Sequence, residues 1–383
     1  MILGMSIQRL FQGDFGFVVS LSEKARKIGG IDLAGSYLTD GPYQPSAELF
    51  RELDDNSFRT LISPYGLPEL REQIAMHLRS NYERVYDPTE EITITHGQTQ
   101  ALLACMLAFL GEDDEVILFE PAAEYYLPII QLCRAKPVYV TLKDPDSHID
   151  WDELTLAVNS NTRMILINTP HSPSGMLMSE LDMLRLQRLI NGTRIIVVSD
   201  ETYKDLIYDT AMHQSIAMFP KLAECGIVMS SLNIGMGLMV QAGFCAAPVE
   251  MMKKIRKVLH FSDGAHFAPL QKAMTHMVPD RSRIAELATY YRKKRECFVN
   301  AIAERTRFDA LPSLAGCFVL LDYYQVSAER DIDFANMLLE QYGVAVAPYS
   351  AFFHDKQKRN LIRVNFARPN EELDKAVDIL GCL

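Results

Sequence analysis

The chain has 383 residues, of which 38 are Lys or Arg and 49 are Asp or Glu, so its net charge is −11 at pH 7. This acidic balance argues against binding to nucleic acids, whose phosphate backbone requires clustered basic side chains. No apolar run approaches the roughly 18–20 residues of a membrane span, and Met1–Leu10 lacks the pattern of a signal peptide. We therefore expect no membrane partner.

Seven cysteines are scattered along the chain without a CxxC pair. We therefore expect neither a metal site nor a disulfide framework, and we expect a cytoplasmic location. Because 383 residues exceed one typical hydrophobic core, we also expect two units within the chain.

Short apolar runs alternate with helical patterns between Pro68 and Pro248. The runs expected to be strands are Glu91–Thr95, Glu115–Phe119, Pro137–Val140, Arg163–Asn168, Arg194–Ser199, Gly226–Ser230 and Ala242–Ala246, and helices are expected over Thr99–Leu110 and near Tyr126–Cys133. Such alternation is typical of an α/β fold in which helices cover both faces of a mostly parallel sheet. Sheets of this kind bind ligands at the carboxyl ends of their strands.

The pattern changes after Pro248. Helical stretches over Val249–Val258 and Ile284–Ala303 lead into apolar runs at Gly316–Asp322, Val344–Pro348 and Leu361–Phe366. We interpret this part as a smaller α+β domain. It includes the first 45 residues, because the apolar run Ile31–Leu33 has no partner nearby in the sequence. The predicted large domain is thus 46–275, and the small domain is 1–45 together with 276–383.

Six segments resemble the landmarks of class I/II aminotransferases, the fold-type I enzymes that use pyridoxal phosphate, and they occur in the family's order. They are Tyr65–Arg71, His96–Leu102, Asn168–Gly175, Ser199–Tyr203, Ala347–Phe352 and Leu361–Phe366, and they extend over most of the chain. The resemblance implies a large domain with a mostly parallel sheet between helices and a smaller α+β domain. It also implies a two-fold homodimer, in which Tyr65 reaches the phosphate site of the neighbouring subunit.

The same resemblance implies roles for individual residues. The turn at Gly97, Gln98 and Thr99 exposes backbone N–H groups at a helix start and suits a phosphate, although an ordinary tight turn looks the same. Asp200 would keep a pyridine nitrogen protonated, with a helix N-cap as the alternative. Arg363 would bind the substrate carboxylate with two parallel N–H groups, although a lone Arg on a strand is usually solvated.

The complete predicted site has three parts. The residues implied for the cofactor are Tyr65, Gly97, Gln98, Thr99, Asn168, Asp200, Tyr203, Ser230 and Gln241, those for an amino-acid or other small carboxylate substrate are Gly35, Ser36, Tyr126 and Arg363, and those at the catalytic positions are Asn233, Asp200 and Tyr203.

The sequence departs from the family at the lysine that forms the Schiff base. The family's S-x-S-K motif corresponds here to Ser230–Asn233, and the pair Gly243 and Phe244 fixes this register. The lysine position therefore holds Asn233, and the position of the phosphate-binding arginine, eight residues later, holds Gln241. No lysine occurs between Lys221 and Lys253. An amide also cannot carry out the lysine's proton transfer, because it does not titrate usefully.

Two further changes affect the same site. Ala123 stands where family members place an aromatic ring on the pyridine face, and Ser172 replaces the asparagine that bonds the 3′-oxygen. Each lost noncovalent contact is typically worth about 1–3 kcal/mol. Several such losses would weaken the binding of pyridoxal phosphate or pyridoxamine phosphate by orders of magnitude.

The sequence leaves three functions open. The first is an aminotransferase-like enzyme that acts on an amino acid or small carboxylate without a lysine-bound cofactor, with candidate groups Asp200, Tyr203, His171, Cys245 and Cys317. The second is an enzyme that binds pyridoxal or pyridoxamine phosphate noncovalently. The third is a non-catalytic scaffold with the aminotransferase fold.

Overall fold

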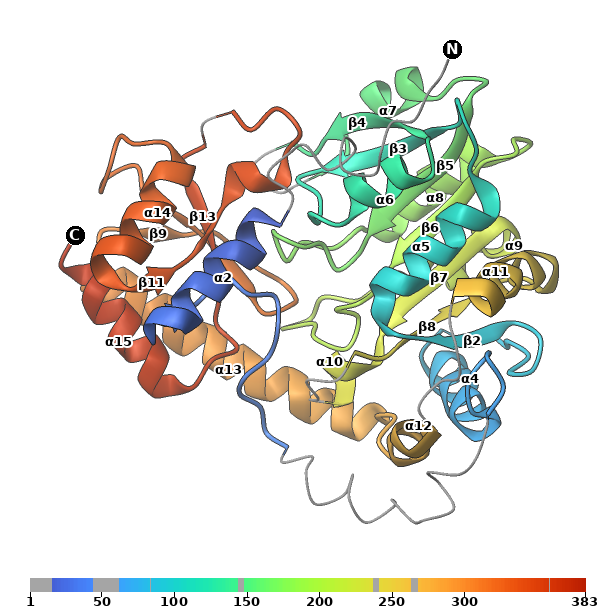
Figure 1. The fold of residues 1–383 in the computed structure, drawn as a ribbon, viewed down its shortest axis with the longest axis horizontal. Coiled ribbons are helices and arrows are strands. Elements are labelled where there is room, and N and C mark those ends of the chain that lie inside the picture. Colours follow the sequence, from blue (N-terminus) through green and yellow to red (C-terminus); the bar gives the residue numbers. More distant parts are fainter. Residues whose placement is uncertain are drawn as a thin grey trace.

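The computed structural model describes residues 16–43, 62–82, 84–143, 148–236, 241–262, 268–357 and 359–383. Its large unit contains a seven-stranded sheet in the order β2-β8-β7-β6-β5-β3-β4 (Figure 1). The strands are β2 (Ile92–Thr95), β3 (Glu115–Glu120), β4 (Lys136–Thr141), β5 (Thr162–Asn168), β6 (Ile196–Asp200), β7 (Gly226–Ser231) and β8 (Gly243–Ala246). β8 runs antiparallel to its two neighbours, β2 and β7, and all the other pairs in this sheet are parallel. The predicted α/β class with a mostly parallel sheet is confirmed.

The apolar strands are buried on both faces, because successive side chains point to opposite sides of a sheet. In β5, Met164 and Leu166 pack into one core, while Ile165 and Ile167 pack into the other. The first core includes α5 (Gly97–Phe109), α6 (Tyr126–Leu132) and α11 (Val249–Ser262); the second includes α4 (Pro68–Tyr82), α7 (Trp151–Ala157), α8 (Glu180–Ile190), α9 (Pro220–Cys225) and α12 (Ala268–Thr275). The short helix α10 (Leu232–Met236) follows β7.

None of the helices within the described ranges combines the length and the apolar composition that crossing a bilayer requires.

The small unit joins both ends of the chain. Its elements are α2 (Phe17–Ile28), β1 (Ile31–Asp32), α13 (Arg281–Arg305), β9 (Asp309–Ala310), β10 (Phe318–Asp322), α14 (Asp331–Tyr342), β11 (Val344–Ala345), β12 (Ala347–Pro348), β13 (Leu361–Asn365) and α15 (Asn370–Gly381). β1 pairs in parallel with β11, so the N-terminal apolar run finds its partner more than 300 residues later. Figure 1 shows α13 extending from the neighbourhood of α12 into this unit.

The predicted run Val344–Pro348 is divided between two sheets. β11 pairs with β1, whereas β12 joins the antiparallel sheet β12-β13-β10-β9. The backbone passes from one sheet to the other at Val346, so a continuous apolar run does not form one continuous strand. The predicted domain boundary after residue 45 lies outside the described residues and stays a prediction.

The two units also touch beside the carboxyl end of β3. The backbone N–H of Ala122 donates to the carbonyl of Phe352 at 2.8 Å, and Glu120 accepts from the backbone N–H of His354 at 2.6 Å. These contacts hold the small unit against the strand ends where a ligand of this fold class would bind.

Gly243 sets how closely β8 approaches the first turn of α5. A Cβ at this position would lie 2.7 Å from the Gly97 carbonyl carbon and 2.9 Å from the Gln98 nitrogen. Both are backbone atoms, which cannot give way as the end of a flexible side chain can. Gly111, by contrast, would place a Cβ 3.8 Å from the Asp114 carboxylate, which is ordinary contact.

We predict that Gly243→Ala lowers the free energy of unfolding by about 1–3 kcal/mol, because the added methyl group overpacks this approach. Gly111→Ala is the matched control and should change it by less than about 1 kcal/mol. The measurement is the urea unfolding curve of each variant. Equal effects of the two substitutions would contradict the close packing described here.

Candidate active site

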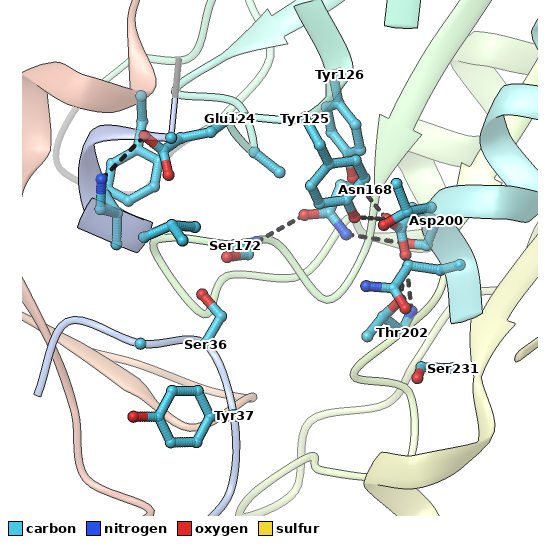
Figure 2. A pocket seen from close by; sticks show the side chains of 18 of the residues that line it. Ser36, Tyr37, Glu124, Tyr125, Tyr126, Asn168, Ser172, Asp200, Thr202 and Ser231 are labelled. Carbon is cyan, nitrogen blue, oxygen red and sulfur yellow. Dashed lines mark hydrogen bonds between the residues drawn. The ribbon is translucent and has the colours of Figure 1, made fainter. Parts of the chain in front are cut away.

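A cavity of about 650 Å³ lies where the two units meet. Asn168, Asp200 and Ser231, the last residues of β5, β6 and β7, line one side of it. Figure 2 shows Ser36, Tyr37 and Glu124 across from them. The cavity is therefore at the carboxyl ends of the parallel strands, as expected for this fold class.

Most of the residues predicted from sequence meet at this cavity. Those that line it are Gly35, Ser36, Gln98, Thr99, Tyr126, Asn168, Asp200, Tyr203, Asn233, Gln241 and Arg363. Tyr65, Gly97 and Ser230 are not among the lining residues. The ring of Tyr65 lies 4.3 Å from the guanidinium carbon of Arg256, and the Ser230 hydroxyl donates to the Glu201 carbonyl at 3.0 Å.

Asp200 is surrounded by donors from its own chain. Its Oδ2 accepts from the hydroxyl groups of Tyr125 at 2.9 Å and Tyr126 at 2.7 Å (Figure 2). Its Oδ1 accepts from the Thr202 hydroxyl at 2.6 Å and the Thr202 backbone N–H at 3.1 Å. An ionised carboxylate offers about four acceptor positions, so Asp200 is saturated. Burial raises its pKa, and these hydrogen bonds oppose that rise.

The rings of the two tyrosines pack against each other beside Asp200. Their rings meet edge to face, with centroids 4.7 Å apart and planes at 78°. Burial, followed by the charge of Asp200, raises the pKa of both phenols well above the usual value for tyrosine. Both therefore stay O–H donors over any working pH range.

Tyr125 is a residue of this cavity that was not predicted from the sequence. The signal was an Ala-Ala-Glu-Tyr-Tyr run directly after a strand, with the expected aromatic ring absent at Ala123 and a new one two residues later.

The side chain at the position of the family's lysine takes part in a local hydrogen bond. Asn233, on α10, accepts through Oδ1 from the hydroxyl of Ser231. Further along the chain, the Gln241 amide lies against the start of α5, because a Cβ on Gly97 would be 2.7 Å from Gln241 Oε1. The start of a helix favours negative charge, but the side chain placed there is neutral and adds no cation for a phosphate.

Arg363 reaches the cavity from β13 and is 2% exposed. The side chains of Ile362 and Val364, which alternate with it, are both buried in the small-unit core, so Arg363 faces the opposite way. Its Nη2 donates to the Ala34 carbonyl at 2.5 Å. Its buried Nε has no hydrogen-bond partner among the described residues.

The aromatic rings of Phe318 and Phe352 lie 4.2 Å and 4.9 Å from the guanidinium carbon of Arg363. Burial lowers the pKa of this guanidinium, which nevertheless remains charged in a protein. Asp322, the internal partner that could have balanced the charge, accepts instead from the backbone N–H of Tyr324 at 2.7 Å. Within the described part of the chain, no carboxylate forms an ion pair with Arg363.

A second buried arginine shows what a satisfied guanidinium looks like in this fold. Arg368 donates to the carbonyl oxygens of Asp32 at 2.6 Å, Tyr37 at 2.5 Å and Gly35 at 3.0 Å. These bonds order the segment that presents Gly35 and Ser36 to the cavity. Arg368 is thus structural, whereas Arg363 retains donors for a ligand.

Three other candidate groups are not available for chemistry in this cavity. Cys245 and Cys317 are fully buried, and burial raises the pKa of the Cys317 thiol to about 12. His171 approaches the Pro121 carbonyl with Nε2 at 2.9 Å, so Nε2 carries the proton. Its Nδ1 then accepts from the Ser174 hydroxyl at 2.7 Å. His171 therefore connects the loops after β3 and β5.

Residues 30–380 match the model of the family described as aminotransferase class I and II. The chain belongs to this family. A methionine aminotransferase of Escherichia coli (strain K12) is 33% identical over 317 residues, which is 82% of each chain. A probable N-succinyldiaminopimelate aminotransferase of Mycobacterium tuberculosis is 26% identical over 397 residues, which is 99% of this chain and 98% of the relative.

Solved aminotransferases share the architecture over its full length. The Escherichia coli protein YbdL, for which a methionine aminotransferase function is reported, superposes with a TM-score of 0.91, 30% identity and complete coverage of both chains. The N-succinyldiaminopimelate aminotransferase of Mycobacterium tuberculosis gives 0.90, with 26% identity and 99% coverage of both chains. Pyridoxal phosphate is the cofactor that this fold implies.

We predict that His171 makes the stability of this aminotransferase-family chain depend on pH. Burial lowers the pKa of His171 from 6.5 to about 4. The unfolded chain therefore binds this proton first, so stability falls as pH drops from 6.5 towards 4, by about 3 kcal/mol in total.

His171→Gln should flatten this pH dependence, and His260→Gln, on the exposed face of α11, is the control that should leave it unchanged. The measurement is the free energy of unfolding in urea at several pH values. A slope that His171→Gln does not alter would show that the buried imidazole does not titrate as described.

Proposed function

We propose that this chain is an aminotransferase-fold enzyme that acts on an amino acid or another small carboxylate without a lysine-anchored pyridoxal phosphate. The observation that supports this proposal most strongly is the difference between the partners of two buried charged side chains. Arg363, which would hold the substrate, lacks an anion among the described residues. Asp200, which would hold the cofactor ring, already accepts four hydrogen bonds.

The residues present do not fit the cofactor at any of its three attachment points. Asn233 cannot form a Schiff base, and Gln241 brings no charge to the phosphate position. At the ring position, Tyr125 would have to leave Asp200 before a pyridine nitrogen could approach. Losing a hydrogen bond to a charged group costs about 1.5–3 kcal/mol, and here no covalent bond offsets the loss.

The state of Arg363 supports a carboxylate ligand. A buried guanidinium without an anionic partner is costly, and a carboxylate accepts two parallel N–H bonds from it in a geometry that suits both groups. Arg363 is anchored by the Ala34 carbonyl on one nitrogen only, and its buried Nε has no hydrogen-bond partner among the described residues. A carboxylate ligand would supply the anionic partner that Arg363 lacks among the described residues.

The relatives support amino acids as the substrate class. Their names refer to methionine and to N-succinyldiaminopimelate, so L-methionine is the first probe to try. Tyr203, which lines the cavity, is the group that we propose for proton transfer, because the acceptor positions of Asp200 are already filled. The homodimer also remains a proposal, which light scattering at micromolar concentration tests.

Noncovalent binding of pyridoxal or pyridoxamine phosphate is the second candidate function. Gln98, Thr99 and Asn168 favour it, since all three still line the cavity. It differs from the main proposal in one respect: the added cofactor would displace the Tyr125 hydroxyl from Asp200.

We predict that Asn233→Lys with Gln241→Arg restores only weak binding of pyridoxal phosphate, because Tyr125 still fills the ring position. Adding Tyr125→Ser should then tighten binding by about tenfold or more and give a yellow, borohydride-fixable protein. The control is Tyr125→Phe in the same background, which removes the hydroxyl and keeps the ring. Stoichiometric cofactor on the unaltered chain, or equal affinity with and without Tyr125→Ser, would contradict this account.

We predict that Arg363→Gln weakens L-methionine binding by about tenfold to hundredfold and changes the melting temperature little. Arg368→Gln is the matched control: it should lower the melting temperature clearly, because its carbonyl partners lose their donors. Isothermal titration calorimetry and thermal unfolding measure the two effects. Lost stability with unchanged ligand response in Arg363→Gln would make this arginine structural and favour the scaffold function.

A further inference from the structure

Of the charged side chains that line the cavity, one cation and one anion lack an oppositely charged partner. Among the described lining residues, the arginines are Arg26 and Arg363 and the carboxylates are Glu124 and Asp200. Arg26 lies at the rim, 3.7 Å from the Asp32 carboxylate, and Asp200 is saturated by hydroxyl and N–H donors. Arg363 and Glu124 remain.

Glu124 projects into the cavity from the loop between β3 and α6. Its Oε1 accepts from the backbone N–H of Val18, in the first turn of α2, at 3.3 Å, and Figure 2 shows this contact on the side away from Asp200. Burial raises the pKa of Glu124, and the backbone N–H groups of Val18 and Phe17, together with the charges of Arg363 and Lys356, oppose that rise. Among the described residues, no Lys, Arg or His lies within ion-pair distance of its carboxylate.

The two unpaired charges attract each other but do not meet. Each is held by the backbone of a different segment: Glu124 by the N–H of Val18 and Arg363 by the carbonyl of Ala34. A pair of opposite charges kept apart in one cavity is complementary to a molecule that carries both signs. A free amino acid is such a molecule, with a carboxylate and an ammonium group joined by one carbon.

We propose that the cavity is a receptor for a zwitterionic amino acid, in which Arg363 binds the carboxylate and Glu124 binds the ammonium group. This inference rests on the proposed function, because it takes Arg363 as the carboxylate ligand. It goes further by giving the amine a noncovalent partner within the chain. Asp200 cannot take this role, since its acceptor positions are already filled.

The competing explanation is that Glu124 only caps α2. A carboxylate near the start of a helix is stabilising by itself, and the contact with the Val18 N–H fits that role. Glu124→Gln separates the two roles, because the amide oxygen can still accept from Val18 while the charge that an ammonium group needs is lost.

The test compares three ligands on the full chain by isothermal titration calorimetry at one pH near neutrality. They are L-methionine, its des-amino analogue 4-(methylsulfanyl)butanoate, and its decarboxylated analogue 3-(methylsulfanyl)propylamine. If L-methionine gives no signal, the other proteinogenic amino acids and their des-amino analogues are titrated in turn, and the best binder replaces it.

We expect the unaltered chain to bind the amino acid at least about tenfold more tightly than either analogue. Glu124→Gln should remove this preference, reducing the affinity for the amino acid to that for the des-amino acid, whose own affinity stays the same or rises. Arg363→Gln should weaken both carboxylates.

Two results would overturn the inference and leave the proposed function standing. One is a Glu124→Gln variant that keeps the preference for the amino acid. The other is an unaltered chain that binds des-amino carboxylates and no amino acid. If Arg363→Gln leaves carboxylate binding unchanged, or if no carboxylate binds at all, the proposed function fails as well.

Discussion

At the carboxyl end of β6, the Asp200 carboxylate accepts hydrogen bonds from three hydroxyl groups and one backbone N–H. A buried carboxylate is tolerable only when its acceptor positions are filled, and this chain fills them with Tyr125, Tyr126 and Thr202. The position of both tyrosine rings follows from this requirement. The phenol of Tyr125 therefore lies on the carboxylate that the family resemblance assigns to the cofactor ring.

Elsewhere in the cavity, charged side chains lack oppositely charged partners. Arg363 is buried with an unpartnered Nε, and Glu124 interacts with the backbone N–H groups of Val18, at 3.3 Å, and Phe17 without a cationic side chain beside it. Nearby, each guanidinium nitrogen of the buried Arg368 donates to a backbone carbonyl. Within the cavity, the charged groups without an ionic partner are thus Arg363 and Glu124, whereas Asp200 is saturated, and this contrast is the physical basis of the proposed function.

Much of this arrangement follows from sequence patterns. Apolar runs of four to six residues identified the seven strands of the large sheet, and the polar ends of β5, β6 and β7 meet at one cavity because parallel strands end at the same edge. Side-chain direction was harder to predict. Ser230 and Ser231 are neighbours on β7, yet strand alternation turns the first towards the Glu201 carbonyl and only the second towards the cavity.

Tyr125 and Glu124 could not be assigned from spacing for a related reason. Their roles depend on where a loop between a strand and a helix directs each side chain, and on which neighbouring acceptor or donor is left over. Those outcomes depend on packing between segments far apart in sequence, such as the contact of Glu124 with α2, 106 residues away.

The most direct test of the central claim is a high-resolution crystal structure of the unaltered chain grown with millimolar pyridoxal phosphate. The account predicts that the Tyr125 hydroxyl stays about 2.9 Å from Asp200 Oδ2 and that no pyridine ring lies on this carboxylate. A pyridine nitrogen bonded to Asp200, with Tyr125 displaced, would contradict it.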